Sequence, residues 1–146
     1  MTTTQANKTT KATLHQKAIA AREHSHSPYS HAKVGAALIL ENGEIFAGCN
    51  IENASFGGTV CAERVAIWNA VSHKGAATFA KNKIKEIMVV TDAVDPWPPC
   101  GMCRQVMAEF CGPETLIHTG NLQDSKKTFR LGELLPESFN PSHLKR

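Results

Sequence analysis

The order of apolar segments along the chain predicts a layered α/β domain, in which a sheet of about five strands carries helices packed on its faces. The segments run helix, strand, strand, helix, strand, helix, strand, strand. A chain of 146 residues with 42% hydrophobic content suits one domain with one core. We expect that single domain over residues 11–146, after a polar, Thr-rich leader over residues 1–10 whose composition predicts disorder.

The first half of the chain predicts a helix, a hairpin and a second helix. Apolar residues at helical spacing favour a helix over residues 11–25. Val34–Leu40 and Ile45–Ile51 are expected to pair as antiparallel strands, because Asn42-Gly43 between them is a strong hairpin turn signal. The helix that follows Cys61 is apolar nearly all round, so we expect it to be buried.

The second half predicts alternating strands and helices. Ile84–Thr91 is expected to form a buried strand, and Asp92–Pro99, with its three prolines, a loop. A helix should begin near Cys100 and end at Cys111-Gly112-Pro113. The remaining expected elements are weaker strands over Thr115–Thr119 and Lys127–Arg130 and a short helix over Leu131–Leu135.

Charge and composition are ordinary for a globular protein and favour a location inside the cell. The net charge is only +3, with no dense Lys/Arg run, which argues against a nucleic acid polymer as partner. No apolar stretch reaches about 18 residues, and the N-terminus lacks the apolar core of a secretory signal. Five cysteines, an odd number, fit metal ligation better than a disulfide framework. We therefore expect a cytoplasmic protein with no membrane partner.

Three cysteines and a glutamate predict a metal centre with a catalytic water. Zn²⁺ favours thiolate ligands in tetrahedral geometry, and a catalytic site leaves its fourth position to water. Cys61 and Cys100 stand at expected helix starts, where unpaired amides stabilise thiolates, and Cys103 lies one turn beyond Cys100. Glu63, in an otherwise apolar helix, is placed to handle the protons of that water.

A structural zinc ribbon is the competing explanation for these cysteines. Such ribbons usually show two closely spaced ligand pairs, whereas this chain has one pair and one single cysteine. Cys49 and Cys111 are expected to be small buried hydrophobic side chains. Arg64 either donates hydrogen bonds to the thiolates and offsets their charge, or forms a plain salt bridge on the helix. The sequence leaves both roles open.

Several segments between residues 14 and 140 share their sequence and their order with a known family. They are Ser27–Ser30, Val34–Leu38, Gly48–Ser55, Val60–Arg64, Pro99–Gln105 and Glu133–Pro136. Through them the chain resembles the small, homotetrameric class of zinc-dependent cytidine deaminases. The resemblance implies a layered α/β/α fold with a mixed sheet and helices on both faces. It also implies hydrolytic deamination of cytidine and deoxycytidine to uridine and deoxyuridine, with release of ammonia, in pyrimidine salvage.

The resemblance further implies the chemical role of each residue at the metal. Cys61, Cys100 and Cys103 would bind one Zn²⁺ per subunit. Zinc-bound hydroxide would attack C4 of the cytosine ring, while Glu63 carries protons to N3 and to the departing ammonia. Arg64 would bond the zinc thiolates.

Four residues are implied as substrate contacts. Asn50 and Glu52 would hydrogen-bond the sugar 3′-hydroxyl, as their spacing of two on a strand end allows, although alone they would be taken for loop caps. Ala62 would also touch the substrate. Phe139 would reach over the base from a neighbouring subunit, so that a homotetramer completes each active site.

Two positions depart from the family pattern and concern the base pocket. Ala32 stands where many members have an aromatic that packs on the pyrimidine, and Phe56 stands where many have tyrosine. We hypothesise that Trp97, in the proline-rich loop before Cys100, supplies the missing aromatic surface.

Two other functions compete with cytidine deamination. One is deamination of a modified nucleoside, such as blasticidin S, or of a base within a polynucleotide, although closure of Asn50 and Glu52 on a 3′-hydroxyl and the modest charge disfavour a continuing strand. The other is a non-catalytic, zinc-stabilised interaction module, which gives no reason for Glu63 beside Cys61.

Overall fold

Five strands form one mixed sheet in the order β2-β1-β3-β4-β5. The structure, a computed structural model, describes residues 3–80 and 83–144, and the side chains from residue 10 onward within those ranges. The strands are β1 (Gly35–Leu40), β2 (Ile45–Cys49), β3 (Ile84–Val90), β4 (Cys111–Gly120) and β5 (Ser125–Arg130). The helices are α1 (Thr3–Arg22), α2 (Ala62–Lys74), α3 (Ala76–Phe79), α4 (Gly101–Phe110) and α5 (Leu131–Leu134), with 3₁₀ turns at Phe56–Gly58 and Pro141–Leu144.

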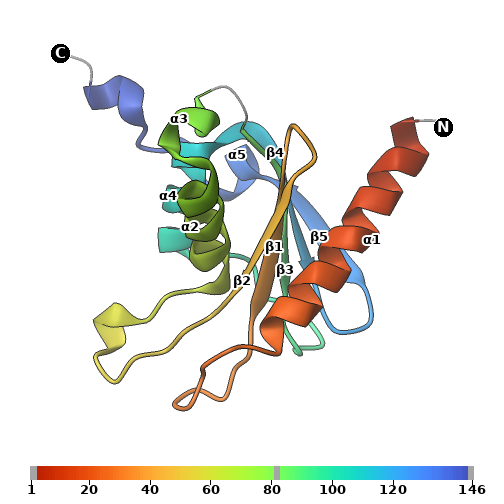
Figure 1. The fold of residues 1–146 in the computed structure, drawn as a ribbon, viewed down its shortest axis with the longest axis vertical. Helices are drawn as coiled ribbons and strands as arrows, with labels where there is room; N and C mark the ends of the chain where they lie inside the picture. Colours follow the sequence, from red (N-terminus) through yellow and green to blue (C-terminus); the bar gives the residue numbers. More distant parts are fainter. Residues whose placement is uncertain (1–2, 81–82, 145–146) are drawn as a thin grey trace.

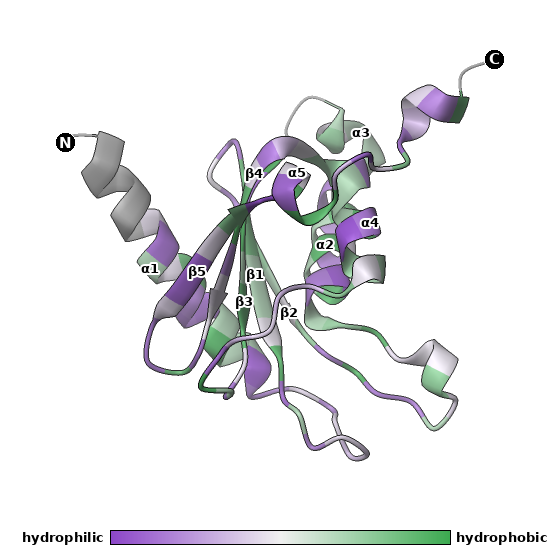
Figure 2. Cartoon of the chain, turned by 180° about the vertical axis from the view of Figure 1, so that it is seen from behind, coloured by the Kyte–Doolittle hydropathy of each residue, from purple (hydrophilic) through white to green (hydrophobic). Residues whose placement is uncertain are grey.

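Helices cover both faces of the sheet, with α1 on one side and α2 and α4 on the other (Figure 1). Because successive residues of a strand point to opposite faces, β1 contributes to two cores. Ala37 packs with Leu14 and Ala18 of α1, whereas Ala36 and Leu38 join the larger cluster beneath α2 and α4. Figure 2 shows the hydrophobic residues gathered along the central strands, while β5 at the sheet edge is largely hydrophilic. The predicted layered α/β class is confirmed.

The sheet topology brings the two cysteine segments together. β1 pairs antiparallel with β2 through the expected hairpin, in which Gly43 adopts a positive φ of 90°. β1 also pairs antiparallel with β3, whereas β3 and β4 run parallel, so the chain must cross over between them through α4. This crossover begins directly after the carboxyl end of β3, which is where ligand sites form in open α/β sheets when strand connections diverge.

A glycine allows α1 to lie unusually close to the start of β1. A Cβ atom at Gly35 would lie 2.0 Å from the backbone oxygen of Ala18 and 2.8 Å from the Cβ of Arg22. No other residue type fits that gap without moving the helix. The last turn of α1 is therefore held against the sheet at the point where β1 begins.

The main differences from the sequence prediction are two element starts and one unexpected helix. α1 begins at Thr3, inside the predicted leader, because no Gly or Pro interrupts the helix before Arg22 and polar composition alone does not stop a helix. β4 starts at Cys111, directly after α4, since Cys111 pairs with Ile84 across a register shift. The short helix α3 was not expected, and the domain boundary at residue 10 remains a prediction. None of the helices in the described part of the chain combines the length and the apolar composition that a membrane span needs.

Candidate active site

Three sulfur atoms gather at the amino ends of α2 and α4. Cys61 is the N-cap of α2 and Cys100 the N-cap of α4, and neither side chain makes a capping hydrogen bond. Cys103, one turn into α4, is fully buried. All three sulfurs lie within 4.8 Å of one another, and those of Cys61 and Cys100 are 4.0 Å apart. Zn–S bonds of about 2.3 Å in a tetrahedron place sulfurs about 3.8 Å apart, so the spacing fits one zinc ion.

The electrostatics of the three thiols also fit a bound cation. A hydrogen bond from Cys103, followed by one from Arg64, lowers the pKa of Cys61 to about 5. The same bond to Cys61, together with burial, raises the pKa of Cys103. One thiolate therefore forms readily, whereas a second is opposed by its neighbours' charge. A divalent cation removes that opposition, and all five cysteines of the chain are free of disulfide bonds.

Arg64 supplies positive charge beside the sulfurs. Its Nη2 donates to the Cys61 sulfur at 3.7 Å and to the backbone oxygen of Thr59 at 3.3 Å. Its guanidinium lies 5.9 Å from the ring centroid of Trp68, within cation–π range. Among the ion pairs of the described residues none involves Arg64. Of the two geometries that the sequence left open, the structure therefore has the hydrogen bond to sulfur.

Glu63 is a buried carboxyl group in the first turn of α2. The whole residue is only 4% exposed to solvent. Burial, followed by the negative charge of Cys61, raises the pKa of Glu63 to about 7. A carboxyl group whose pKa lies near neutrality exchanges protons readily in both directions, which is what general acid–base catalysis requires.

A pocket of about 410 Å³ opens beside the sulfurs. Its lining includes most of the predicted site residues, namely Cys61, Ala62, Glu63, Cys100, Asn50 and Glu52. A second pocket of similar volume, about 420 Å³, lies around Lys83, Cys111 and Leu135 and is lined by none of them. Volumes of this size accommodate a small molecule. The pocket beside the sulfurs is the candidate active site, because only there do the reactive groups converge.

Asn50 forms part of the pocket wall and is anchored by three hydrogen bonds. Its Oδ1 accepts from the backbone amide of Val34 at 2.8 Å and from the hydroxyl of Ser25 at 2.5 Å. Its Nδ2 donates to the backbone oxygen of Ala32 at 2.8 Å. The residue is 9% exposed, so these bonds fix the orientation of the amide. Sequence reasoning did not identify these partners.

Glu52 is the second anchored residue of the same wall. Its Oε2 accepts from the backbone amides of Tyr29 at 2.9 Å and Ser30 at 3.2 Å, and its Oε1 accepts from the hydroxyl of Ser30. The hydrogen bond from Ser30 lowers the pKa of Glu52, which keeps the group a carboxylate at neutral pH. Asn50 and Glu52 thus tie loops together, and both line the pocket, while their contact with a sugar stays a prediction.

The aromatic residues are distributed unevenly around the site. Within the described lining of the pocket, Trp97 is the only aromatic residue, and Ala32 lines the same space. Phe56 is 73% exposed and meets Tyr29 edge to face at 5.7 Å. Phe139 is 56% exposed and outside the lining, and its backbone oxygen accepts from Gln105 at 2.8 Å. The structure therefore brings Trp97, but not Phe139, to the pocket of its own chain.

A layered α/β fold, a three-sulfur cluster at the edge of a pocket and a buried carboxyl group in its lining define a zinc-dependent enzyme. The sequence model of the cytidine and deoxycytidylate deaminase zinc-binding region matches residues 8–119. The chain belongs to this family, and it is a hydrolase of the class that acts on carbon–nitrogen bonds. The zinc-binding region and the sulfur cluster together assign one zinc ion to each chain.

Individual relatives are similar over most of their length. A cytidine deaminase of Halalkalibacterium halodurans is 46% identical over 126 residues, which cover 86% of this chain and 91% of that protein. A cytidine deaminase of Sporosarcina psychrophila is 44% identical, with 85% and 87% covered. The crystal structure of a cytidine deaminase from Burkholderia pseudomallei superposes with a TM-score of 0.77 at 40% identity, covering 88% of this chain and 98% of that one.

Proposed function

We propose that this enzyme deaminates cytidine and deoxycytidine to uridine and deoxyuridine, as a cytoplasmic step of pyrimidine salvage. The observation that carries the proposal is that one pocket is lined by Glu63, by two cysteines of the sulfur cluster and by the anchored pair Asn50 and Glu52. The first group supplies hydrolytic chemistry, and the second supplies polar contacts for a sugar. Family membership supports the same reaction.

Cys61, Cys100 and Cys103 would hold the zinc ion. A bound zinc ion supplies Lewis-acid activation of water near neutral pH. Three thiolates exceed the charge of Zn²⁺ by about one unit, which weakens such activation. The hydrogen bond from Arg64 to the Cys61 sulfur draws electron density from the thiolate and so offsets the excess negative charge.

Glu63 would move the protons of the reaction. It takes one proton from the attacking water and delivers it to N3 of the ring, and it passes the second to the amino group that leaves. A new bond forms between the water oxygen and C4, the C4–N bond breaks, and ammonia departs. Because Glu63 is 4% exposed, bulk water does not compete for these protons.

Asn50 and Glu52 would recognise the sugar through its 3′-hydroxyl. Both line the pocket, and both are held in place by backbone groups of the loop that runs from Ser25 to Val34. Preorganised polar groups bind a ligand without a further ordering cost, so a nucleoside should be preferred to the free base.

A homotetramer in which a neighbour's Phe139 covers the base is proposed as the working assembly. The exposure of Phe139, 56%, and its absence from the lining of its own pocket support a role in another subunit's site. Full activity in a protein that sediments as a monomer would contradict this assembly. Neither a polynucleotide nor a membrane is proposed as a partner. The net charge is only +3, and the proposed closure of Asn50 and Glu52 on a 3′-hydroxyl leaves no path for a continuing strand.

The test of the function is a substrate series followed by ultraviolet absorbance. Purified enzyme should convert cytidine and deoxycytidine but leave cytosine unchanged, and a zinc chelator should stop both conversions. Absence of nucleoside conversion by zinc-loaded enzyme would refute the proposed function. Equal turnover of free cytosine would refute sugar recognition alone.

Replacing Trp97 by alanine is expected to raise KM for cytidine about tenfold with little change in kcat. Stacking of a base on an aromatic side chain contributes about 1–3 kcal/mol, and Trp97 is the only aromatic in the described lining. Trp97→Phe should retain most of the affinity. Val94→Ala is the matched control, since Val94 lies in the same loop but is 90% exposed and outside the lining. An unchanged KM in Trp97→Ala would rule out the stacking role.

A further inference from the structure

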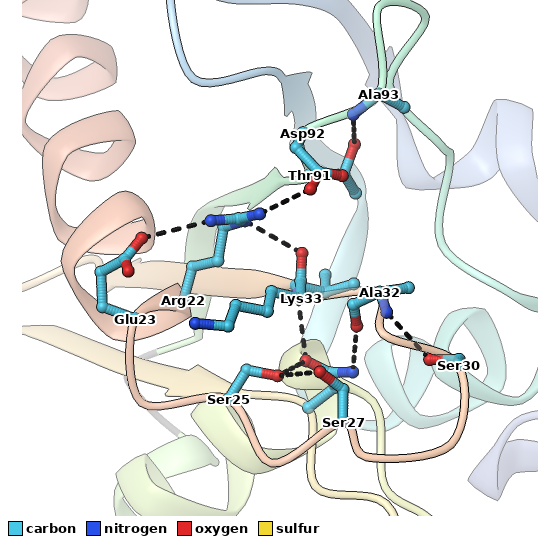
Figure 3. Close-up of polar contacts among 12 residues, drawn as sticks. Arg22, Glu23, Ser25, Ser27, Ser30, Ala32, Lys33, Thr91, Asp92 and Ala93 are labelled. Atoms are coloured by element: carbon cyan, nitrogen blue, oxygen red, sulfur yellow. Dashed lines mark hydrogen bonds and ion pairs between the residues drawn. The ribbon is translucent and has the colours of Figure 1, made fainter.

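Arg22, the last residue of α1, has a guanidinium group for which the proposed chemistry has no use. The side chain is only 8% exposed. Its Nε donates to the backbone oxygen of Lys33 at 3.0 Å, and its Nη2 donates to a carboxylate oxygen of Asp92 at 2.8 Å (Figure 3). Its Nη1 reaches Glu23 at 3.2 Å. A buried arginine with such specific partners requires an explanation, because removing a charge from water is costly.

The first partner of Arg22 lies in the wall that carries Asn50. Lys33 stands between Ala32 and Val34, both of which line the pocket. The backbone oxygen of Ala32 and the backbone amide of Val34 are two of the three groups that hold the Asn50 amide, at 2.8 Å each. By holding the carbonyl group between them, Arg22 fixes the backbone on which the orientation of Asn50 depends.

The second partner of Arg22 lies in the neighbouring segment, because β1 begins beside the end of β3, where Gly35 pairs with Val90. Asp92 follows Thr91, a lining residue that is 1% exposed and comes directly after β3. One guanidinium therefore connects the loop before β1 with the segment after β3, as the dashed lines of Figure 3 show. These segments are far apart in the sequence, and the planar fork of arginine suits such double contact better than lysine.

Arg22 itself is placed by backbone packing. The close approach at Gly35, where a Cβ would lie 2.8 Å from the Cβ of Arg22, fixes the end of α1 against β1. The guanidinium therefore starts from a rigid position. Glu23, its third partner, has a side chain that is 60% exposed and touches no lining residue among the contacts described.

We propose that Arg22 is a positioning residue for sugar recognition, acting through Lys33 and Asp92 on the placement of Asn50. The inference rests on the proposed nucleoside function. It extends the site to a residue at the end of α1 that contacts no substrate. In this proposal Lys33 and Asp92 affect substrate binding, whereas Glu23 does not.

The test compares three variants on two substrates. Arg22→Lys and Asp92→Asn should each raise KM for cytidine about tenfold, the equivalent of one charge-assisted hydrogen bond, with kcat and zinc content retained. KM for 3′-deoxycytidine, which lacks the group that Asn50 binds, should change far less. Arg22→Met, which keeps no hydrogen-bond donor, should raise KM for cytidine more than Arg22→Lys does. Glu23→Gln is the matched control and should leave both KM values unchanged.

Two outcomes would overturn the inference. A lowered melting temperature with unchanged KM for both substrates would show that Arg22 only stabilises the fold. Equal increases in KM for both substrates would show that Arg22 does not act through the contact between Asn50 and the 3′-hydroxyl. Asp92→Asn keeps the test decisive if the Arg22 variants fail to fold, since the Asp92 side chain is 53% exposed. Failure of the proposed function itself is recognised separately, as absence of cytidine turnover in the unaltered enzyme.

Discussion

Glu63→Ala should bind zinc and fold normally but lose cytidine turnover by about 10²- to 10⁴-fold in kcat, the usual contribution of a positioned acid–base group. The side chain is buried beside the sulfur cluster and lines the pocket, so no solvent group takes over its protons. Glu52, the other carboxylate of the lining, is already engaged by Tyr29 and Ser30. Steady-state kinetics, zinc content and circular dichroism together check this expectation.

Two further variants sharpen the assignment. Glu63→Gln keeps the size and polarity of the side chain but not its proton exchange, so it should lose as much activity as the alanine variant. Glu109→Ala, on the exposed side of α4, should retain full turnover. Near-normal turnover in zinc-loaded Glu63→Ala would exclude Glu63 as the proton carrier.

Cys103→Ala is expected to lose both the metal and the activity, and to melt at a lower temperature. Only two sulfurs would remain, at the ends of α2 and α4, and two thiolates make a poor site for zinc. A ligand that binds only the folded state at 1,000 times its Kd stabilises that state by about 4 kcal/mol, which sets the scale of the loss. Elemental analysis and thermal unfolding with and without a chelator measure it.

The matched control for the metal site is another buried cysteine. Cys111 is 5% exposed, and burial raises its pKa to about 12, which keeps it a neutral thiol. Cys111→Ala should therefore keep one zinc per chain and retain turnover, whatever it costs in packing. A full complement of zinc in Cys103→Ala would mean that the three sulfurs do not form the metal centre.

The sequence predicted the fold well where local signals and tertiary structure agree. The hairpin at Asn42-Gly43, the helix after Cys61 and the strand beginning at Ile84 all appear, because turn chemistry and apolar runs determine them locally. The helix is buried on one face only, however, since Trp68 is 47% exposed. The predicted start of α1 was too late. The low hydrophobicity of the first ten residues suggests disorder, but this segment contains no residue that breaks a helix. The strand start at Cys111 depends on pairing with Ile84, which no local pattern reveals.

The candidate site divides in the same way. The gathering of the three cysteines could be anticipated, since each follows or closely follows a loop at a helix start, where metal ligands are commonly held. The anchoring of Asn50 by Ser25 and Val34 could not be anticipated, nor could the contact from Arg22 to Asp92. Such contacts join residues that only the topology of the sheet brings together, so no spacing along the chain announces them.

The hydrogen bonds already made by Asn50 and Glu52 determine what a ligand of this part of the pocket must offer, and in the proposed function that ligand is a sugar. The Asn50 oxygen accepts two bonds, which leaves a single N–H for a ligand, and Oε1 of Glu52 keeps one lone pair. The proposed substrate meets a donor and an acceptor at once. A hydroxyl group satisfies both, a ketone or an ether has no proton for Glu52, and a phosphate ester brings negative charge against it. If Asn50 and Glu52 bind the sugar as proposed, this wall would select by hydrogen-bond polarity rather than by size, and it would distinguish a free nucleoside from the same nucleoside esterified at its 3′ oxygen.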